Sequence, residues 1–178
     1  MTSLFDPIQA GDLHLANRIA MAPLTRNRSP QAVPRDITAT YYAQRASAGL
    51  LITEGTAISA QGQGYSDVPG LYGSDQLDGW KKVTQAVHAR GGRIVTQLWH
   101  VGRVSHSLLQ PGRAAPVAPS AVQANAKTYV VNPETGQGEF MHTCTPRALT
   151  AEELPDIVHT YAAAARNAVR SAGFDGVE

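Results

Sequence analysis

Two polar side chains stand near the ends of apolar runs, where hydrogen-bonding groups could meet a ligand. Thr25 comes three residues after the run Ile19–Ala22, and Gln97 lies near the end of the run Arg93–Leu98. A primary amide has one acceptor and two donors, so it can pair with a ring edge of alternating carbonyl and N–H groups without adding charge. Alone, Gln97 is more typical of a hydrogen-bonded core amide. The joint placement of both residues at strand ends favours a binding site.

Two aromatic residues lie near the same predicted strand ends. Tyr65 is in the glycine-rich loop 61–73, and Trp99 directly follows the run that contains Gln97. Either ring could shape a substrate pocket, although loop packing for Tyr65 and core packing for Trp99 are equally good interpretations of the residues alone. The six histidines show no metal-ligand spacing with a third partner, so we expect no metal site.

The positioning elements follow from the spacing of apolar residues. A short hairpin at residues 7–15 precedes strands that alternate with helices. We expect the hairpin to plug one end of a barrel. The predicted strands are residues 19–22, 50–54, 93–98 and 174–178, and the predicted helices are residues 36–48, 74–89 and 150–172.

The sequence also predicts where the helices end and which face of the last helix is buried. Gly49 should end the first helix in the left-handed conformation, which glycine adopts without a Cβ clash. The last helix should begin with a capping box at Thr150–Glu153 and end at Gly173. The residues expected to line its buried face are Leu154, Ile157, Val158, Tyr161 and Ala165.

Residues 101–149 show no sustained period. Loops of this length in compact domains are usually functional or disordered, and we expect a lid over the site.

Strands that alternate with helices predict an α/β fold with a parallel sheet, either doubly wound or a (β/α)8 barrel. A doubly wound nucleotide-binding fold carries glycines in its first strand-to-helix turn. That turn is Pro23-Leu24-Thr25-Arg26 here, with no glycine. The barrel is therefore favoured, with the chain supplying roughly the first three and a half β/α units and the hairpin.

Composition excludes several classes of protein. The 178 residues carry a formal net charge of +1 without a basic run, so nucleic acid is not an expected partner. Cys144 is the only cysteine, which excludes an internal disulfide. No stretch approaches the length of a membrane span, and we expect a cytoplasmic protein with no membrane partner.

Four motifs follow one another along the chain: Asn17–Arg26, Tyr41–Ala46, Leu51–Thr56 and Gln97–Arg103. Together they resemble the Old Yellow Enzyme family of flavin-dependent ene reductases. The closest subgroup is that of the bacterial N-ethylmaleimide, xenobiotic and pentaerythritol-tetranitrate reductases. The resemblance spans essentially the whole chain and implies a single FMN-binding (β/α)8 domain, of which residues 1–178 are the N-terminal half.

The resemblance also implies roles for individual residues. Pro23, Leu24, Thr25, Ala57 and Gln97 would bind FMN, with Gln97 on the pyrimidine edge and Thr25 near the C4 carbonyl and N5. Tyr65 and Trp99 would contact the substrate. The activity implied is ping-pong hydride transfer from NAD(P)H to an activated alkene of an α,β-unsaturated carbonyl or nitro compound.

Complete members of the family carry their proton donor and a histidine pair, or a histidine and an asparagine, beyond the position matching Glu178. We therefore expect no catalytic residue within this chain. A four-strand open sheet would expose two edges and an apolar face, so we expect a complementary C-terminal half, in a separate chain or as the rest of a longer enzyme. Self-association, a non-catalytic half-barrel that only assembles with a partner, and another flavin or sugar-phosphate barrel are the alternatives.

Overall fold

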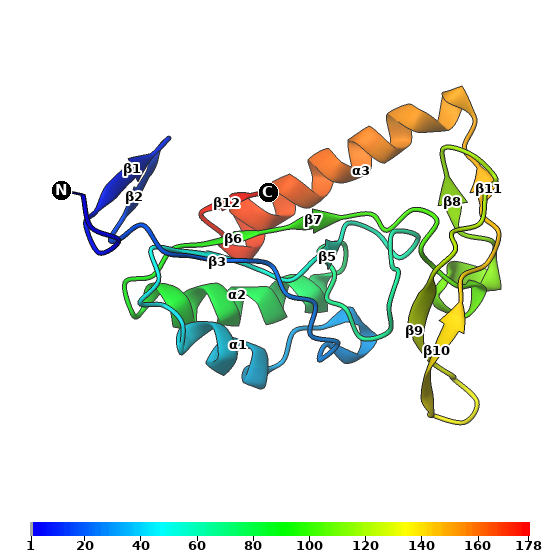
Figure 1. Cartoon of the computed structure of the whole chain (residues 1–178), viewed down its shortest axis with the longest axis horizontal. Coiled ribbons are helices and arrows are strands. Elements are labelled where there is room, and N and C mark those ends of the chain that lie inside the picture. Colours follow the sequence, from blue (N-terminus) through cyan, green and yellow to red (C-terminus); the bar gives the residue numbers. More distant parts are fainter. Residues whose placement is uncertain (1) are drawn as a thin grey trace.

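A four-stranded parallel sheet forms the centre of the computed structural model, which describes residues 2–178. Its spatial order is β12–β6–β4–β3, so the four strands lie side by side in the order in which they occur along the chain (Figure 1). A doubly wound sheet reverses its order at a switch point, whereas a barrel does not. The observed order therefore fits the barrel arrangement. The four strands are β3 (Ala20–Met21), β4 (Leu50–Ile52), β6 (Ile94–Thr96) and β12 (Gly176–Val177).

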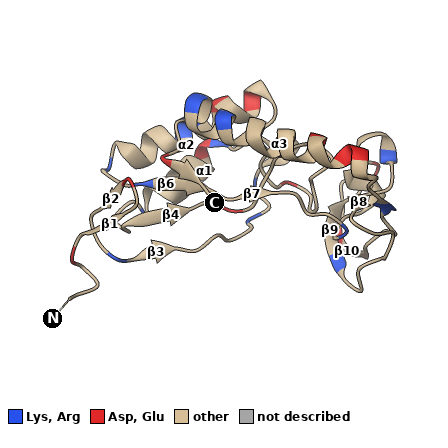
Figure 2. Ribbon diagram, turned by 90° about the horizontal axis from the view of Figure 1, so that it is seen from above, with Lys and Arg blue, Asp and Glu red and all other residues tan. Residues whose placement is uncertain are grey.

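Three helices lie together on one side of this sheet (Figure 2). Gly91 and Gly173, which follow the second and third helices, have φ values of 75° and 79°, the left-handed conformation that glycine adopts at little cost. The helices are α1 (Asp36–Ala43), α2 (Ser74–His88) and α3 (Leu154–Arg166), and α3 continues as a π-helical segment, Asn167–Ala172.

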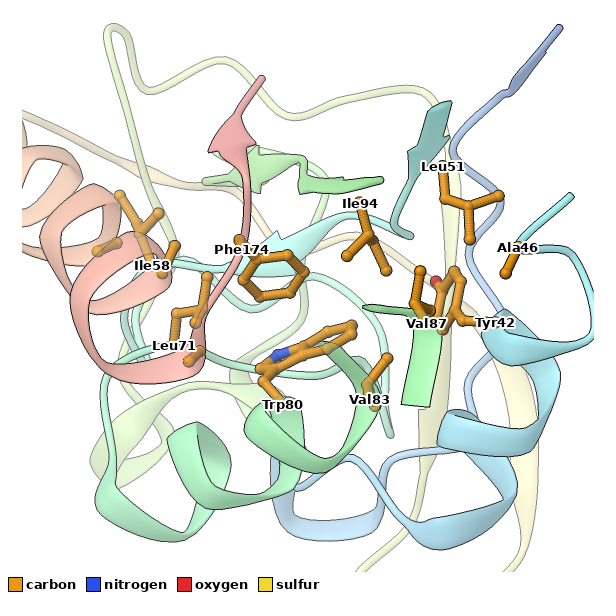
Figure 3. Packing of buried hydrophobic residues seen from close by; sticks show 13 residues of the cluster. Tyr42, Ala46, Leu51, Ile58, Leu71, Trp80, Val83, Val87, Ile94 and Phe174 are labelled. Atoms are coloured by element: carbon orange, nitrogen blue, oxygen red, sulfur yellow. The ribbon is translucent and has the colours of Figure 1, made fainter. Parts of the chain in front are cut away.

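The hydrophobic core fills the space between the helices and the sheet, with Trp80 of α2 at its centre (Figure 3). The Trp80 ring is fully buried and meets the ring of Phe174 edge-on, with 5.2 Å between centroids. Its indole N–H donates a hydrogen bond to the carbonyl of Gly70 at 3.1 Å, so burial leaves no polar atom unpaired. Ile94 and Leu51 belong to the same cluster and contribute to it from the strands, with Leu51 at the end near Ala46 and Tyr42.

Asp175 attaches β12 to the rest of the sheet. Its carboxylate accepts a hydrogen bond from the backbone N–H of Ile94 at 2.8 Å and lies 2.8 Å from His88 Nε2. The backbone N–H of Asp175 donates to the Ile94 carbonyl at 2.9 Å. These bonds fix the register in which Gly176 lies opposite Val95.

The first helix is shorter than predicted, and Gly49 serves a different purpose. α1 ends at Ala43, and tighter turns carry the chain to β4. Gly49 is not left-handed; a Cβ there would lie 2.0 Å from the carbonyl oxygen of Asn17. The Asn17 side chain also accepts a hydrogen bond from the Gly49 N–H at 2.8 Å. The glycine is needed for close approach of two backbones.

The buried face of α3 also differs from the prediction. Leu154 and Val158 are 49% and 65% exposed, because the first turns of α3 extend beyond the sheet (Figure 1). Ala164, Ala168 and Ala172 are the buried residues of this helix and its π-helical continuation. Small side chains there allow close packing against α2. The capping box at its start is partly confirmed, because the Thr150 N–H donates to Glu153 Oε2 at 2.8 Å.

The predicted N-terminal hairpin is confirmed as β1 (Ile8–Ala10) and β2 (Leu13–Leu15), which lie near the end where the parallel strands begin (Figure 1). Its role as a plug stays a prediction. The segment 101–149 contains an antiparallel hairpin that its lack of period did not reveal. The remaining strands are β5 (Thr56–Ala57), β7 (Leu98–Trp99), β8 (Val117–Ala118), β9 (Lys127–Val131), β10 (Gly138–His142) and β11 (Arg147–Ala148).

Replacing Gly49 with alanine should destabilise the protein by about 3 kcal/mol or more, because the new methyl group would force Asn17 and β4 apart. Urea unfolding measures the change. The matched control is Gly136→Ala, where φ is 68° and no atom lies within 4 Å of an added Cβ. Its loss of unfolding free energy should be about 1 kcal/mol. Equal losses for both variants would contradict the close-approach explanation.

Candidate functional site

The carboxyl ends of β3 and β6 carry the two residues that opened the sequence analysis. Thr25 is exposed four residues after β3, and Leu24 beside it is 56% exposed, an apolar side chain without a cover. Gln97 follows β6 directly and is half-buried. Its amide donates to Glu178 Oε2 at 3.1 Å, on the exposed side of the strand. Both polar groups remain accessible to a ligand.

A buried cluster of threonine hydroxyls holds the backbone at Gln97 in place. The hydroxyl oxygens of Thr53 and Thr96 lie 3.0 Å apart, and those of Thr96 and Thr56 lie 3.2 Å apart. The backbone N–H of Gln97 donates to Thr53 Oγ1 at 3.3 Å. All three threonines are fully buried, so this part of the strand end is rigid.

The two aromatic residues proposed to contact the substrate lie side by side. The rings of Tyr65 and Trp99 stack with 5.6 Å between centroids and 29° between planes. Gly55 provides the space, because a Cβ there would lie 2.8 Å from the Trp99 ring and 3.4 Å from Gln97 Oε1. The sequence did not indicate that Gly55 seats both side chains.

Ala57 lies deeper than the other candidates. It pairs with Trp99 between β5 and β7 and is fully buried. Its N–H donates to the Pro69 carbonyl at 2.8 Å, and its carbonyl accepts from the Leu71 N–H at 3.0 Å. Ala57 is therefore an interior residue paired with Trp99, and its contact with a cofactor stays a prediction. Pro23 is half-buried between β3 and Leu24.

Glu54 is a buried carboxyl that sequence reasoning passed over. It is 2% exposed at the end of β4 and accepts a hydrogen bond from the backbone N–H of Arg26 at 3.1 Å. Burial raises the pKa of Glu54 to about 6, although Arg26 acts in the opposite direction. The Arg26 guanidinium lies 3.8 Å from the centroid of the Tyr41 ring. The sequence signal was a charged residue placed directly after Thr53, at the end of a predicted buried strand.

His100 adds a second buried polar group beside Trp99. Its Nδ1 accepts a hydrogen bond from the Gly102 N–H at 3.1 Å, which assigns the proton to Nε2. That Nε2 is buried and finds no partner within residues 2–178. Burial lowers the pKa of His100 and keeps the ring neutral.

A cleft of about 590 Å³ separates the loop after β3 from the β9–β10 hairpin. It is lined by residues 25–28, Tyr65, Asp67, Tyr129 and Phe140, and we call it the hairpin cleft. Thr25 and Tyr65 therefore share one cavity. The segment predicted to form a lid supplies the opposite wall.

Two kinds of feature are absent from residues 2–178. No group of three or more His, Cys, Asp or Glu side chains is arranged to hold a metal ion within this range. None of the helices described there combines the length and apolar character needed to cross a membrane.

Comparison with known proteins identifies the family. Residues 3–178 match the model of the NADH:flavin oxidoreductase / NADH oxidase family. The chain is 46% identical to 12-oxophytodienoate reductase 7 of Oryza sativa subsp. japonica, covering 98% of this chain and 44% of that protein. It is 48% identical to a chanoclavine-I aldehyde reductase of Penicillium roqueforti, covering 100% of this chain and 45% of the relative.

Solved structures give the same result. A structure of morphinone reductase in complex with tetrahydroNAD superimposes with a TM-score of 0.96 at 52% identity, over 99% of this chain and 48% of that one. An Old Yellow Enzyme homologue from Zymomonas mobilis gives a TM-score of 0.91 at 46% identity, over 99% of this chain and 47% of the other.

The fold matches about half of the length of flavin oxidoreductase barrels of the Old Yellow Enzyme type. The chain belongs to the NADH:flavin oxidoreductase / NADH oxidase family, as its motifs predicted. It spans about half the length of the curated relatives it matches.

Because of Glu54, the stability of the folded protein should fall as the pH rises. A salt-bridged acid would give the opposite dependence. The pKa of Glu54 is about 6 in the folded protein and near 4.5 when unfolded, so the folded state favours the proton. The stabilisation is complete below about pH 4.5 and is lost as the pH rises through about 6, by roughly 2 kcal/mol. Urea unfolding at several pH values measures it.

The variant Glu54→Gln should flatten this pH dependence, because its side chain stays neutral throughout. Glu139→Gln, in the exposed part of β10, is the control and should leave the profile of the parent unchanged. A profile for Glu54→Gln identical to that of the parent would show that burial does not raise the pKa of Glu54.

Proposed function

We propose that this chain forms the N-terminal half of an FMN-dependent NAD(P)H oxidoreductase. The enzyme would reduce activated C=C bonds of α,β-unsaturated carbonyl or nitro compounds by ping-pong hydride transfer. Family membership supports the reaction class, and relatives named as reductases of 12-oxophytodienoate, morphinone and chanoclavine-I aldehyde support a small-molecule substrate. The chain spans about half of those relatives, so the activity is proposed for an assembly that also contains the other half.

The residues at the strand ends fit a flavin. Gln97 presents an amide whose side-chain partner, Glu178, is exposed and can be displaced. Leu24 offers an uncovered apolar surface, and Thr25 offers an exposed hydroxyl next to it. A flat ring with a polar edge needs this combination of an apolar support and neutral hydrogen-bonding groups.

The candidate residues at the strand ends would each have a specific role. When bound, FMN supplies the hydride-transfer chemistry. Gln97 would bind the pyrimidine edge, held in place by its backbone bond to Thr53. Thr25 would donate a hydrogen bond that stabilises the electron-rich reduced ring. Tyr65 and Trp99 would orient the substrate through their stacked rings.

We assign no proton donor to residues 2–178. A complementary half, in the same chain or in a partner, would supply the proton donor and the remaining flavin contacts. The observation that carries the proposal is the rigid placement of an accessible Gln97 amide beside the Tyr65–Trp99 stack, with Gly55 packed against both Gln97 and Trp99.

The variants Gln97→Ala and Thr25→Ala test the assignment in the assembled protein. Gln97→Ala should weaken FMN binding about tenfold, the effect of losing one or two hydrogen bonds of about 1 kcal/mol each. Thr25→Ala should slow flavin reduction by NAD(P)H more than it weakens binding, because its hydrogen bond strengthens as the ring gains charge. Fluorescence titration and stopped-flow absorbance give the two quantities.

Gln137→Ala and Thr135→Ala are matched controls at exposed positions of the β9–β10 turn and should change neither quantity. Unchanged flavin affinity and unchanged reduction rate in both test variants would refute the proposed function.

A further inference from the structure

One hydrogen bond fixes the backbone of the loop that carries Thr25. The Arg26 N–H donates to Glu54 Oε2 at 3.1 Å. Within residues 2–178, no other backbone N–H from Leu24 to Arg28 donates a hydrogen bond. Because the peptide group is planar, a bond that fixes the Arg26 N–H also fixes the Thr25 carbonyl, which points the opposite way. Glu54 therefore sets the orientation of the backbone at Thr25.

Glu54 is itself held by the hydrophobic core. Its backbone N–H donates to the hydroxyl oxygen of Tyr42 at 2.9 Å, and Tyr42 is a fully buried core residue of α1. Arg26 is also fixed at its other end, since its guanidinium lies over the Tyr41 ring. The carboxylate and the loop are therefore held relative to one another by the packed interior.

The groups that act on the Glu54 carboxyl come from the loop after β3 and from α1. Burial raises the pKa of Glu54 to about 6, while hydrogen bonds from Arg26 and Tyr42 and the charges of Arg26 and Arg28 oppose that rise. The carboxyl is thus mostly ionised above about pH 7, and an ionised acceptor makes the stronger hydrogen bond to a backbone N–H.

A purely structural role does not account for an acid at this position. The raised pKa means that ionised Glu54 lowers the stability of the fold at neutral pH. A neutral side chain of similar volume would avoid that loss. Buried ionisable groups of this kind are typical of functional sites, and this one bonds directly to the residue after Thr25.

We propose that Glu54 is a positioning residue for hydride transfer: its carboxylate holds the Arg26 peptide and thereby fixes the Thr25 backbone, which places the Thr25 hydroxyl for its hydrogen bond to the flavin. The inference rests on the proposed function, because it takes Thr25 to contact the flavin. Glu54 is 2% exposed, so it acts through the loop and not by contact with a ligand.

Amide hydrogen exchange, followed by NMR in the assembled protein, tests the loop without any flavin chemistry. Glu54→Leu removes the acceptor and should speed exchange of the Arg26 amide about tenfold, whereas Glu54→Gln retains a side-chain oxygen and should keep most of the protection. Glu54→Ala takes the place of Glu54→Leu if the latter does not fold. Equal exchange of the Arg26 amide in the parent and in the variant without an acceptor would overturn the inference.

Stopped-flow reduction of the FMN-loaded protein by NAD(P)H tests the consequence for the reaction. Glu54→Leu should slow flavin reduction about tenfold while changing the dissociation constants of FMN and NAD(P)H less than about twofold, and Glu54→Gln should recover most of the rate. Thr84→Val, which removes a buried hydrogen bond from α2 to the Ala172 carbonyl, is the matched control for lost stability and should leave the rate unchanged.

A double-mutant cycle shows whether Glu54 acts through Thr25. If it does, adding Glu54→Leu to Thr25→Ala should slow flavin reduction no further, because the hydroxyl that it positions is gone. Two effects that multiply in full would overturn the positioning role.

The rates of the single variants separate this inference from the proposed function. If Thr25→Ala slows flavin reduction and Glu54→Leu does not, the proposed function stands and the inference is overturned. If neither variant nor Gln97→Ala alters flavin affinity or reduction, while the Arg26 amide still depends on Glu54, the proposed function is refuted and Glu54 keeps its role in holding the loop.

Discussion

The parallel pairing of β3, β4, β6 and β12 in chain order is the constraint on which the site depends. Parallel strands in one sheet bring all their carboxyl ends to the same edge. Thr25, Glu54, Gln97 and Glu178 follow the four strands and therefore gather there, although up to 153 positions separate them in the sequence numbering. The register of β12, held by Asp175, completes this edge.

Burial of the helix-facing side of the sheet stabilises the fold and offsets the free-energy cost of placing polar groups at the strand ends. The core around Trp80 excludes water from the helix side, and the threonine cluster satisfies its own hydroxyls. Glu54 is the exception, since it remains a buried acid with a raised pKa. Polar groups that weaken a fold are typical of functional sites, and Glu54 lies at the end of β4 beside the loop that carries Thr25.

Much of the fold could be predicted from the sequence because the apolar runs are regular. The four strands, the three helices, the hairpin at 8–15 and the glycines after α2 and α3 were all recognisable. The β9–β10 hairpin was not, because its strands are largely exposed and Phe140 faces a cleft instead of a core. The exposure of Leu154 could not be foreseen, because periodicity shows which residues share a face but not whether another element covers it.

The site was predictable only in part. Gln97, Tyr65 and Trp99 stood out by type and place, and the structure brings the two aromatic rings together. Gly55 and Gly49 were not interpretable from sequence, because close approach between distant segments leaves no local signal. The family resemblance, confirmed by the match over residues 3–178, supplied roles that spacing alone could not.

We have proposed that the strand ends of this chain bind the ring of a flavin. A crystal structure of the protein with FMN tests this proposal most directly. We expect the flavin ring to lie over Leu24, with the Gln97 amide released from Glu178 and within hydrogen-bond distance of the pyrimidine edge. A flavin bound elsewhere, with Gln97 still bonded to Glu178, would show that the strand ends are not the flavin site.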